Sequence, residues 1–118
     1  MTNKNSKKHP IPCIRARGGA GQRLSEKQIE RKLVEAVKKK GGIAPKFVSP
    51  GLDGVPDRIV LLPHGVIAFV ELKAPGCRMH PLQARRKGQL EMLGFRVYCV
   101  DGAEQIQEVL KEIGGDAG

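Results

Sequence analysis

The sequence predicts an α/β fold in which a mixed central sheet is flanked by helices, with the element order α-β-β-β-α-β-α. Two neighbouring apolar runs, residues 57–62 and 66–72, are rich in valine and isoleucine, as is typical of buried central strands. A third such run covers residues 95–100. Segments with apolar residues at helical spacing lie before, between and after these runs, so we expect helices to cover the sheet.

Length and composition indicate one small domain with an aliphatic core. The chain has 118 residues, of which 40% are hydrophobic but only 3% aromatic. No apolar run approaches the roughly 18–20 residues of a membrane span, and the N-terminus lacks the apolar segment of a secretory signal. We therefore expect a cytoplasmic protein that is neither secreted nor bound to a membrane. Cys13, Cys77 and Cys99 show no CxxC spacing, which predicts reduced thiols and no zinc site, with Cys99 in the core.

The positive charge is unevenly distributed along the chain. The formal net charge is +9, and six of the 21 Lys and Arg residues lie in residues 1–24, which contain no acidic residue. This arm, which contains glycine and proline, precedes a domain at residues 25–118. A basic arm of this kind is typical of polyanion binding, and a solubilising tail is the alternative interpretation.

The first helix is expected to follow Ser25, a good N-cap with Gln28 at capping-box spacing, and to end at Gly41. Residues 43–49 predict a short strand, which Pro45 weakens. The remaining expected elements are strands at residues 57–62, 66–72 and 95–100 and helices at residues 81–93 and 103–113.

The two central strands are joined by only three residues, Pro63 to Gly65, so they should form a hairpin. If Leu62 pairs with Val66, continuing the ladder places Asp57 opposite Glu71. Because side chains alternate between faces, Lys73 should share the face of these two carboxylates. A register shifted by one residue would separate them.

Two opposed carboxylates about 5 Å apart repel each other and destabilise a sheet. A divalent cation removes this repulsion, and Mg²⁺ and Mn²⁺ prefer carboxylate oxygens and water as ligands. Lys73 could then hold a phosphate or a nucleophilic water. In the alternative, purely structural interpretation, Asp57 caps the loop and Glu71 pairs with Lys73 or an arginine.

Pro56-Asp57 followed by Glu71-Leu72-Lys73 resembles the signature of the PD-(D/E)XK nucleases. The wider pattern resembles the virus-type replication-repair nuclease family, VRR-NUC, in the segments SEKQIERKLVEAVKKKGG, KFVSPGLDGVPDRIVLLP, FVELKAPG, PLQ and LGFRVYCV. The resemblance covers about residues 25–113 and implies a restriction-endonuclease-like fold.

The resemblance implies a metal-dependent phosphodiesterase that acts on DNA. Asp57 and Glu71 would be metal ligands together with the backbone carbonyl of Leu72, and Lys73 would orient or activate the attacking water. Members of the family also carry a glutamate on the first helix, for which Glu26 and Glu30 are both candidates. The spacing to the glycine that ends the helix favours Glu30.

Gln83 matches a glutamine that the family places near the lysine or the substrate phosphate. An ordinary polar residue at the start of a helix is the alternative interpretation of this side chain.

Basic residues on the helix after the second central strand are the expected DNA contacts: Arg85, Arg86 and Lys87, with the N-terminal arm, and also Arg78 and Lys46. We expect contacts to phosphates, because the sequence contains no helix-turn-helix or zinc finger that would read bases. No organic cofactor is expected.

Selection of a branched structure such as a Holliday junction fits this arrangement, and cutting two strands would require a homodimer. The resemblance to the family further implies a setting in the cytoplasm of a bacterial or phage-infected cell. A non-catalytic nucleic-acid binder and a restriction-type duplex endonuclease remain the alternative functions.

Overall fold

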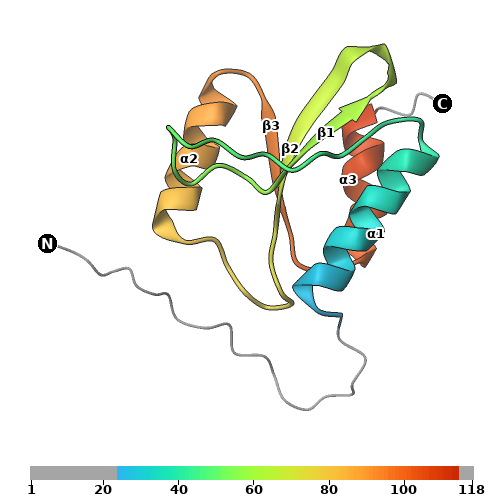
Figure 1. The fold of residues 1–118 in the computed structure, drawn as a ribbon, viewed down its shortest axis with the longest axis horizontal. Coiled ribbons are helices and arrows are strands. Elements are labelled where there is room, and N and C mark those ends of the chain that lie inside the picture. The colour runs from blue at the N-terminus through green and yellow to red at the C-terminus, as the bar shows by residue number, and fades with distance from the viewer. Residues whose placement is uncertain (1–23, 115–118) are drawn as a thin grey trace, which may run out of the picture.

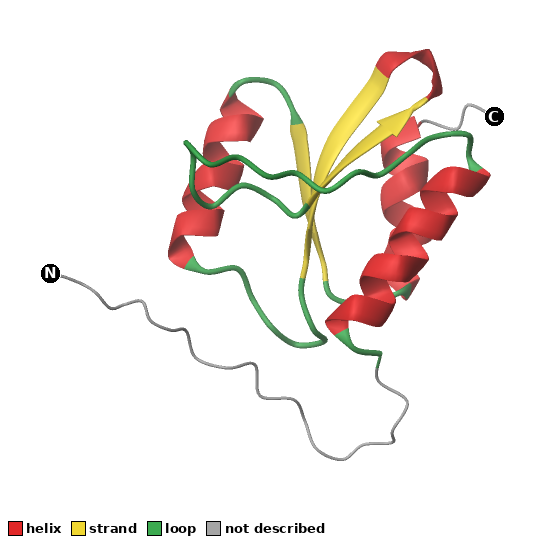
Figure 2. Cartoon of the chain, viewed as in Figure 1, coloured by secondary structure: helices red, strands yellow, loops and turns green. Residues whose placement is uncertain are grey.

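The computed structural model describes residues 24–114, in which three strands form one mixed sheet. The element order is α1 (Glu26–Lys39), β1 (Arg58–Leu62), β2 (Val66–Leu72), α2 (Pro81–Met92), β3 (Arg96–Val100) and α3 (Glu104–Gly114). β2 lies in the centre of the sheet, antiparallel to β1 and parallel to β3. α1 and α3 lie on one side of the sheet and α2 on the other (Figure 1, Figure 2). The predicted mixed α/β class is confirmed.

The first helix begins and ends where its capping residues predict. The Ser25 Oγ accepts a hydrogen bond from the Gln28 backbone N–H at 3.1 Å, and the Gln28 side chain accepts one from the Ser25 N–H at 2.8 Å. Beyond the helix, Gly41 has a φ of 87°, a left-handed conformation that favours glycine. The first turn of α1 lies near the open end of the hairpin, where the charges of Asp57 and Lys73 act on Glu26.

The strand predicted at residues 43–49 is the main difference from the expected fold. The segment follows the outer edge of β1 through two isolated bridges, Ile43 with Leu61 and Lys46 with Arg58, and forms no continuous strand. Pro45 has no N–H to donate, although its carbonyl accepts a hydrogen bond from Ile59 at 3.0 Å. Within the described residues the sheet thus has three strands where four were expected.

The predicted hairpin register is confirmed. β1 and β2 pair from Leu62 with Val66 to Arg58 with Val70. The connection is a 3₁₀ turn, Pro63–Gly65, in which His64 adopts a φ of 71°. One position beyond the last pair, the register brings Asp57 alongside Glu71.

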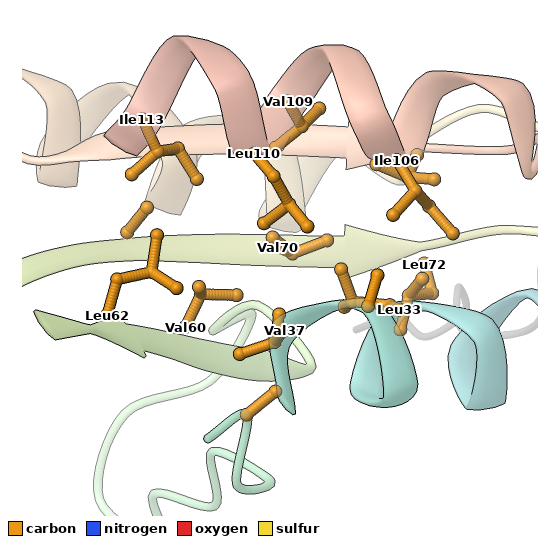
Figure 3. Close-up of a cluster of buried hydrophobic side chains, with 14 of the residues drawn as sticks. Leu33, Val37, Val60, Leu62, Val70, Leu72, Ile106, Val109, Leu110 and Ile113 are labelled. Atoms are coloured by element: carbon orange, nitrogen blue, oxygen red, sulfur yellow. The ribbon is translucent and has the colours of Figure 1, made fainter. Parts of the chain in front are cut away.

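A continuous apolar core fills the space between the sheet and the pair α1 and α3 (Figure 3). The strands contribute Val60, Leu62, Val70 and Leu72. The predicted apolar face of α3 is confirmed, since its buried residues are Ile106, Val109, Leu110 and Ile113. Each side chain of this size contributes roughly 1.5–3 kcal/mol when fully buried. This core holds the sheet and α1 as one rigid support for the open end of the hairpin.

The opposite face of the sheet is covered less completely. Phe69 stacks against Phe47 and Phe95, with ring centroids 5.6 and 5.7 Å apart. α2 has no buried side chain along its whole length. Ile67, Met92, Leu93 and Phe95 remain exposed on and near this face.

The cysteine predictions need correction. Cys99 is a free thiol and is exposed, because β3 is an edge strand and this side chain lies on the face that α2 covers incompletely. Cys77 is disulfide-bonded, so the expectation of reduced thiols is wrong at this position. None of the helices in residues 24–114 has the length and apolar character needed to cross a bilayer. The basic arm, residues 1–24, lies outside the described residues apart from Leu24.

Candidate active site

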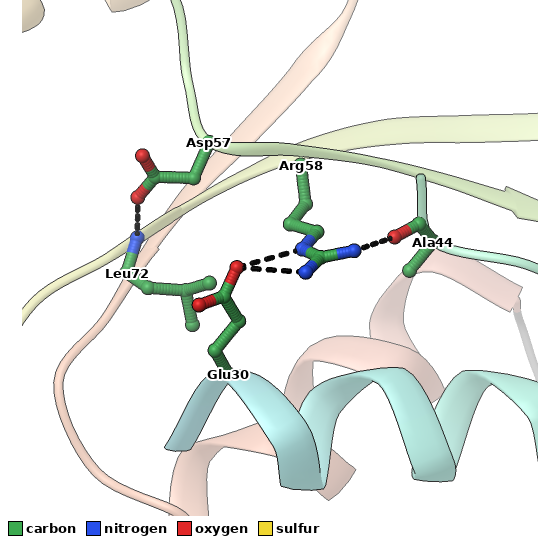
Figure 4. A network of polar contacts seen from close by, with 5 residues as sticks. All are labelled: Glu30, Ala44, Asp57, Arg58 and Leu72. Carbon is green, nitrogen blue, oxygen red and sulfur yellow. Dashed lines mark hydrogen bonds and ion pairs between the residues drawn. The ribbon is translucent and has the colours of Figure 1, made fainter. Parts of the chain in front are cut away.

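Asp57 lies where the loop after residue 49 enters β1. Its Oδ2 accepts a hydrogen bond from the backbone N–H of Leu72 at 2.8 Å, which ties the carboxyl to the end of the neighbouring strand (Figure 4). Burial raises the pKa of this carboxyl, while the hydrogen bond from Leu72 and the charge of Lys73 act in the opposite direction. The residue therefore combines the loop-capping role of the structural interpretation with a position next to Glu71.

Glu71 is almost completely buried near the end of β2, with 1% of its surface exposed. Its Oε2 accepts a hydrogen bond from the Gln83 Nε2 at 2.6 Å and lies 3.3 Å from the Lys73 Nζ. Its Oε1 is buried and has no hydrogen-bond partner in the described part of the chain. A buried acceptor without a hydrogen-bond partner is destabilising, so a ligand bound to this oxygen would stabilise the site.

The electrostatics of Glu71 agree with this geometry. Burial, followed by the negative charge of Asp57, raises the pKa of Glu71 to about 7, although Lys73 lowers it. At neutral pH the carboxylate is therefore only partly ionised in the protein alone. A cation between the two carboxyls would stabilise the ionised form.

Lys73 follows β2 directly, and its backbone N–H donates to the Val100 carbonyl at 2.9 Å. Its side chain is 11% exposed and forms an ion pair with Glu71. The predicted convergence of Asp57, Glu71 and Lys73 at one end of the hairpin is present in the structure.

The two glutamates of α1 have different environments. The Glu30 Oε2 accepts from the Arg58 Nε at 2.9 Å and lies 2.8 Å from its Nη2, while the Arg58 Nη1 donates to the Ala44 carbonyl at 2.6 Å (Figure 4). Glu26 has no such partner within residues 24–114, and partial burial and the charge of Asp57 raise its pKa. The charge of Glu26 also contributes to the raised pKa of Glu71. Glu30 is thus paired with an arginine, although its charge still raises the pKa of Asp57. Glu26 has no such partner among the described residues and interacts electrostatically with Asp57 and Glu71.

The residues present can hold a divalent cation, but not as a complete cage of side chains. Asp57 and Glu71 offer carboxyl oxygens. Leu72, which lies between Glu71 and Lys73 in the sequence, offers a backbone carbonyl. Within residues 24–114, no group of three or more His, Cys, Asp or Glu side chains is arranged to bind a metal. Water molecules would have to complete the coordination, as is usual for Mg²⁺.

Gln83 forms two hydrogen bonds, one of which is that of an ordinary polar residue at the start of a helix. Its Oε1 accepts a hydrogen bond from the His80 backbone N–H at 2.9 Å, which caps the start of α2. Its Nε2 donates to Glu71 at the same time. An ordinary helix-start residue therefore also fixes the orientation of the buried carboxylate.

The expected DNA contacts are mostly outside this cluster. Arg85 is exposed and has no hydrogen bond or ion pair with the described residues, whereas Lys87 forms an ion pair with Glu91 at 2.7 Å. Arg86 donates to the Asp53 carbonyl and to Gln89. An open pocket of about 380 Å³ is lined by Leu82, Arg85, Arg86 and Gln89. Arg78 and Lys46 are exposed.

Sequence reasoning missed Arg58 and the contacts of Arg86. Arg58 follows Asp57 directly, so its side chain points to the opposite face of the sheet, toward α1. A partly buried arginine on that face needs an acidic partner. That argument alone would have pointed to a glutamate on α1. The contact of Arg86 with a backbone carbonyl has no signal in the sequence.

Comparison with known proteins supports the fold. No family model matches the chain. The chain is 52% identical over 81 residues to "Putative nuclease p44" of Acyrthosiphon pisum secondary endosymbiont phage 1, which covers 69% of this chain and 87% of that protein. A solved structure described as a VRR_NUC domain is 30% identical, with a TM-score of 0.69, and the match covers 73% of this chain and 94% of that one.

A mixed α/β domain with two carboxyls and a lysine at the open end of its central hairpin defines the class of protein, one of the PD-(D/E)XK type. Within that class, the chain belongs to the VRR-NUC family. The resemblance expected from its motifs is confirmed.

Proposed function

We propose that the protein is a divalent-metal-dependent endonuclease that hydrolyses phosphodiester bonds in DNA. The observation that carries the proposal is the buried Oε1 of Glu71, which has no hydrogen-bond partner among the described residues and belongs to a carboxyl that interacts with Asp57. The nuclease name of the phage relative and the VRR_NUC description of the structural relative support the same reaction class.

In this proposal Asp57, Glu71 and the carbonyl of Leu72 hold Mg²⁺ or Mn²⁺, with Glu26 or Glu30 acting from α1 through water. A bound cation would supply charge stabilisation on the scissile phosphate and lower the pKa of the attacking water. Gln83 keeps the Glu71 carboxylate in place through its hydrogen bond. The ion pair between Glu71 and Lys73 lies at the end of a strand, which fixes the two side chains better than a loop would.

Lys73 would orient the water and stabilise negative charge that develops on the phosphate. Its amine lies within the site and its strand neighbour Val100 anchors its backbone. The position suits a group that acts on the reacting phosphate, because it is held before the substrate arrives.

Exposed basic residues would contact the DNA backbone. Arg85, Arg78 and Lys46 are available for this purpose because they are exposed, and Lys87 and Arg86 add positive charge to the same helix as Arg85. Such contacts give affinity and salt dependence without reading bases. We therefore propose that the enzyme selects DNA by shape, with branched DNA such as a four-way junction as its preferred substrate.

We further propose that the enzyme works as a homodimer, in the cytoplasm of a bacterial or phage-infected cell. The exposed apolar side chains Ile67, Met92, Leu93 and Phe95 support an interface near the junction of α2 and β3. Two copies would present two sites to the two strands of a junction. The phage origin of the relative supports the cellular setting.

The experiment that tests the reaction compares the wild type with Glu71→Ala and Lys73→Ala on labelled DNA. We expect each substitution to lower cleavage by about 100-fold or more, because each removes a charge from the reacting centre. Binding to DNA, measured in EDTA, should change little. Cleavage at wild-type rates by either purified variant would overturn the proposed mechanism.

A further inference from the structure

α2 contacts both chain segments that carry the central carboxyls. From its first turn, the Gln83 Nε2 donates to the Glu71 Oε2 at 2.6 Å. One turn later, the Arg86 Nε donates to the Asp53 carbonyl at 2.7 Å. Asp53 belongs to the loop that leads into Asp57, so one helix reaches both sides of the site.

The loop packs closely against α2 at Gly54. This residue has a φ of 78°, and a Cβ atom built on it would lie 2.9 Å from both the Cγ and the carbonyl oxygen of Leu82. Only glycine fits a left-handed conformation at this distance from a helix backbone. Asp57 follows three residues later, after the buried Pro56, so fixing the loop here also restricts the position of Asp57.

Polar contacts carry much of the attachment of α2, because none of its side chains is buried. Arg86 also donates to Gln89 one turn on, at 2.6 Å, which holds its guanidinium in the orientation that reaches Asp53. The neighbouring Arg85 makes no hydrogen bond with the described residues and is exposed. Two adjacent arginines of one helix thus have different environments.

We propose that Arg86 is a positioning residue that fixes Asp57 relative to Glu71, by tying the loop before Asp57 to α2. The inference deepens the proposed function and rests on it for its effect on cleavage. The Leu72 N–H provides a local reporter of the position of Asp57, because it donates to the Asp57 Oδ2 at 2.8 Å.

The test compares two pairs of variants. Arg86→Ala and Arg85→Ala each remove one positive charge from α2, but only the first removes the contact with the loop. Gly54→Ala disturbs the packing of the same loop against α2, at Leu82, without changing the charge. Gly51→Ala is its control, because a Cβ atom at position 51 meets nothing within 4 Å. Three quantities are measured: amide hydrogen exchange at Leu72 by NMR, and kcat and KM for DNA cleavage with Mg²⁺.

We expect Arg86→Ala and Gly54→Ala to accelerate exchange at Leu72 and to lower kcat by about 10-fold or more, as is usual when a group that orients a ligand is lost. Arg86→Lys, which can still donate to the Asp53 carbonyl, should recover part of both effects. Arg85→Ala should raise KM and leave exchange at Leu72 as in the wild type. Unchanged protection of the Val70 amide in the middle of β2 shows that a variant is folded.

The proposal is overturned if Arg86→Ala and Arg85→Ala behave alike, with a raised KM and wild-type exchange at Leu72. A wild-type protein that cleaves no DNA with Mg²⁺ or Mn²⁺ overturns the proposed function instead. In that case exchange at Leu72 still decides whether Arg86 positions Asp57.

Discussion

Among the described residues, Glu71 is the one buried charged group, and its surroundings explain why its position suits a cation. One carboxyl oxygen is held by Gln83 and Lys73, and the other has no hydrogen-bond partner in residues 24–114. The fold thus pre-orients the carboxylate and leaves one oxygen available.

The raised pKa of Glu71 predicts a pH dependence of stability in metal-free buffer. The folded protein holds the proton up to a pH of about 7, whereas the unfolded chain releases it near 4.5. This contribution to stability is therefore fully present below pH 4.5 and is lost as the pH rises through about 7. The loss can reach roughly 3 kcal/mol in the free energy of unfolding.

Urea unfolding of the wild type and of Glu71→Gln between pH 4.5 and 8 measures this effect. In the variant, most of the decrease in the free energy of unfolding with rising pH should be absent, because the glutamine side chain does not ionise. The pKa values of Asp57 and Glu26 are also raised, and this contribution to the pH dependence remains in both proteins. Identical pH profiles for the two proteins would contradict the burial of an ionisable Glu71.

The two glutamates of α1 should respond differently to removal of their charge. Glu30→Gln leaves the partly buried Arg58 without its ion-pair partner, so we expect a loss of about 1–3 kcal/mol in the free energy of unfolding. Glu26→Gln should change stability by less than about 0.5 kcal/mol, since most of this side chain is exposed and only part of it is buried. Calorimetric titration with Mn²⁺ then shows which substitution weakens metal binding. Equal thermal stability of the two variants would contradict the role of the pair Glu30 and Arg58.

At the scale of elements, α1 and α2 are attached to the sheet by different forces. α1 buries an apolar face in the core, whereas α2 is held by polar contacts and by its connections. Leu33→Ala in α1 should lower the free energy of unfolding by about 2–5 kcal/mol, because Leu33 is fully buried. Leu93→Ala at the end of α2 should cost less than about 1 kcal/mol, since Leu93 is 67% exposed. Urea denaturation measures the free energy of unfolding of both variants. A similar loss in Leu33→Ala and Leu93→Ala would contradict the different attachment of the two helices.

The elements with strong local signals were predictable from the sequence. The cap at Ser25, the three-residue connection at residues 63–65 and the apolar periodicity of α3 each specify a local geometry. The irregular edge at residues 43–49 was mispredicted, because Pro45 interrupts the ladder although its neighbours pair with β1. Exposure of Cys99 depends on its position in an edge strand, which the apolar pattern of β3 does not reveal.

Much of the candidate site was also predictable, because the hairpin register alone brings Asp57, Glu71 and Lys73 together. The contacts that hold these side chains depend on tertiary structure. The pair Glu30 and Arg58 spans 28 positions in the sequence, and Arg86 reaches back 33 positions to Asp53. No local pattern specifies such contacts.

At the scale of the whole molecule, the proposed dimer makes a prediction about mass. Light scattering at micromolar concentration should give about twice the 12.8 kDa of one chain. The double substitution Met92→Glu and Leu93→Glu places charges on the exposed apolar side chains near the junction of α2 and β3 and should produce a monomer. A wild-type mass of one chain would contradict the proposed dimer.

The central claim is that the cluster of Asp57, Glu71 and Lys73 hydrolyses DNA with a divalent metal. The most direct measurement is cleavage of a labelled four-way junction beside a linear duplex and a single strand, with Mg²⁺, with Mn²⁺ and with EDTA. We expect paired cuts in the junction that require the metal and that disappear with EDTA. Tight binding of DNA without cleavage in either metal, or cleavage that persists in EDTA, would contradict the account.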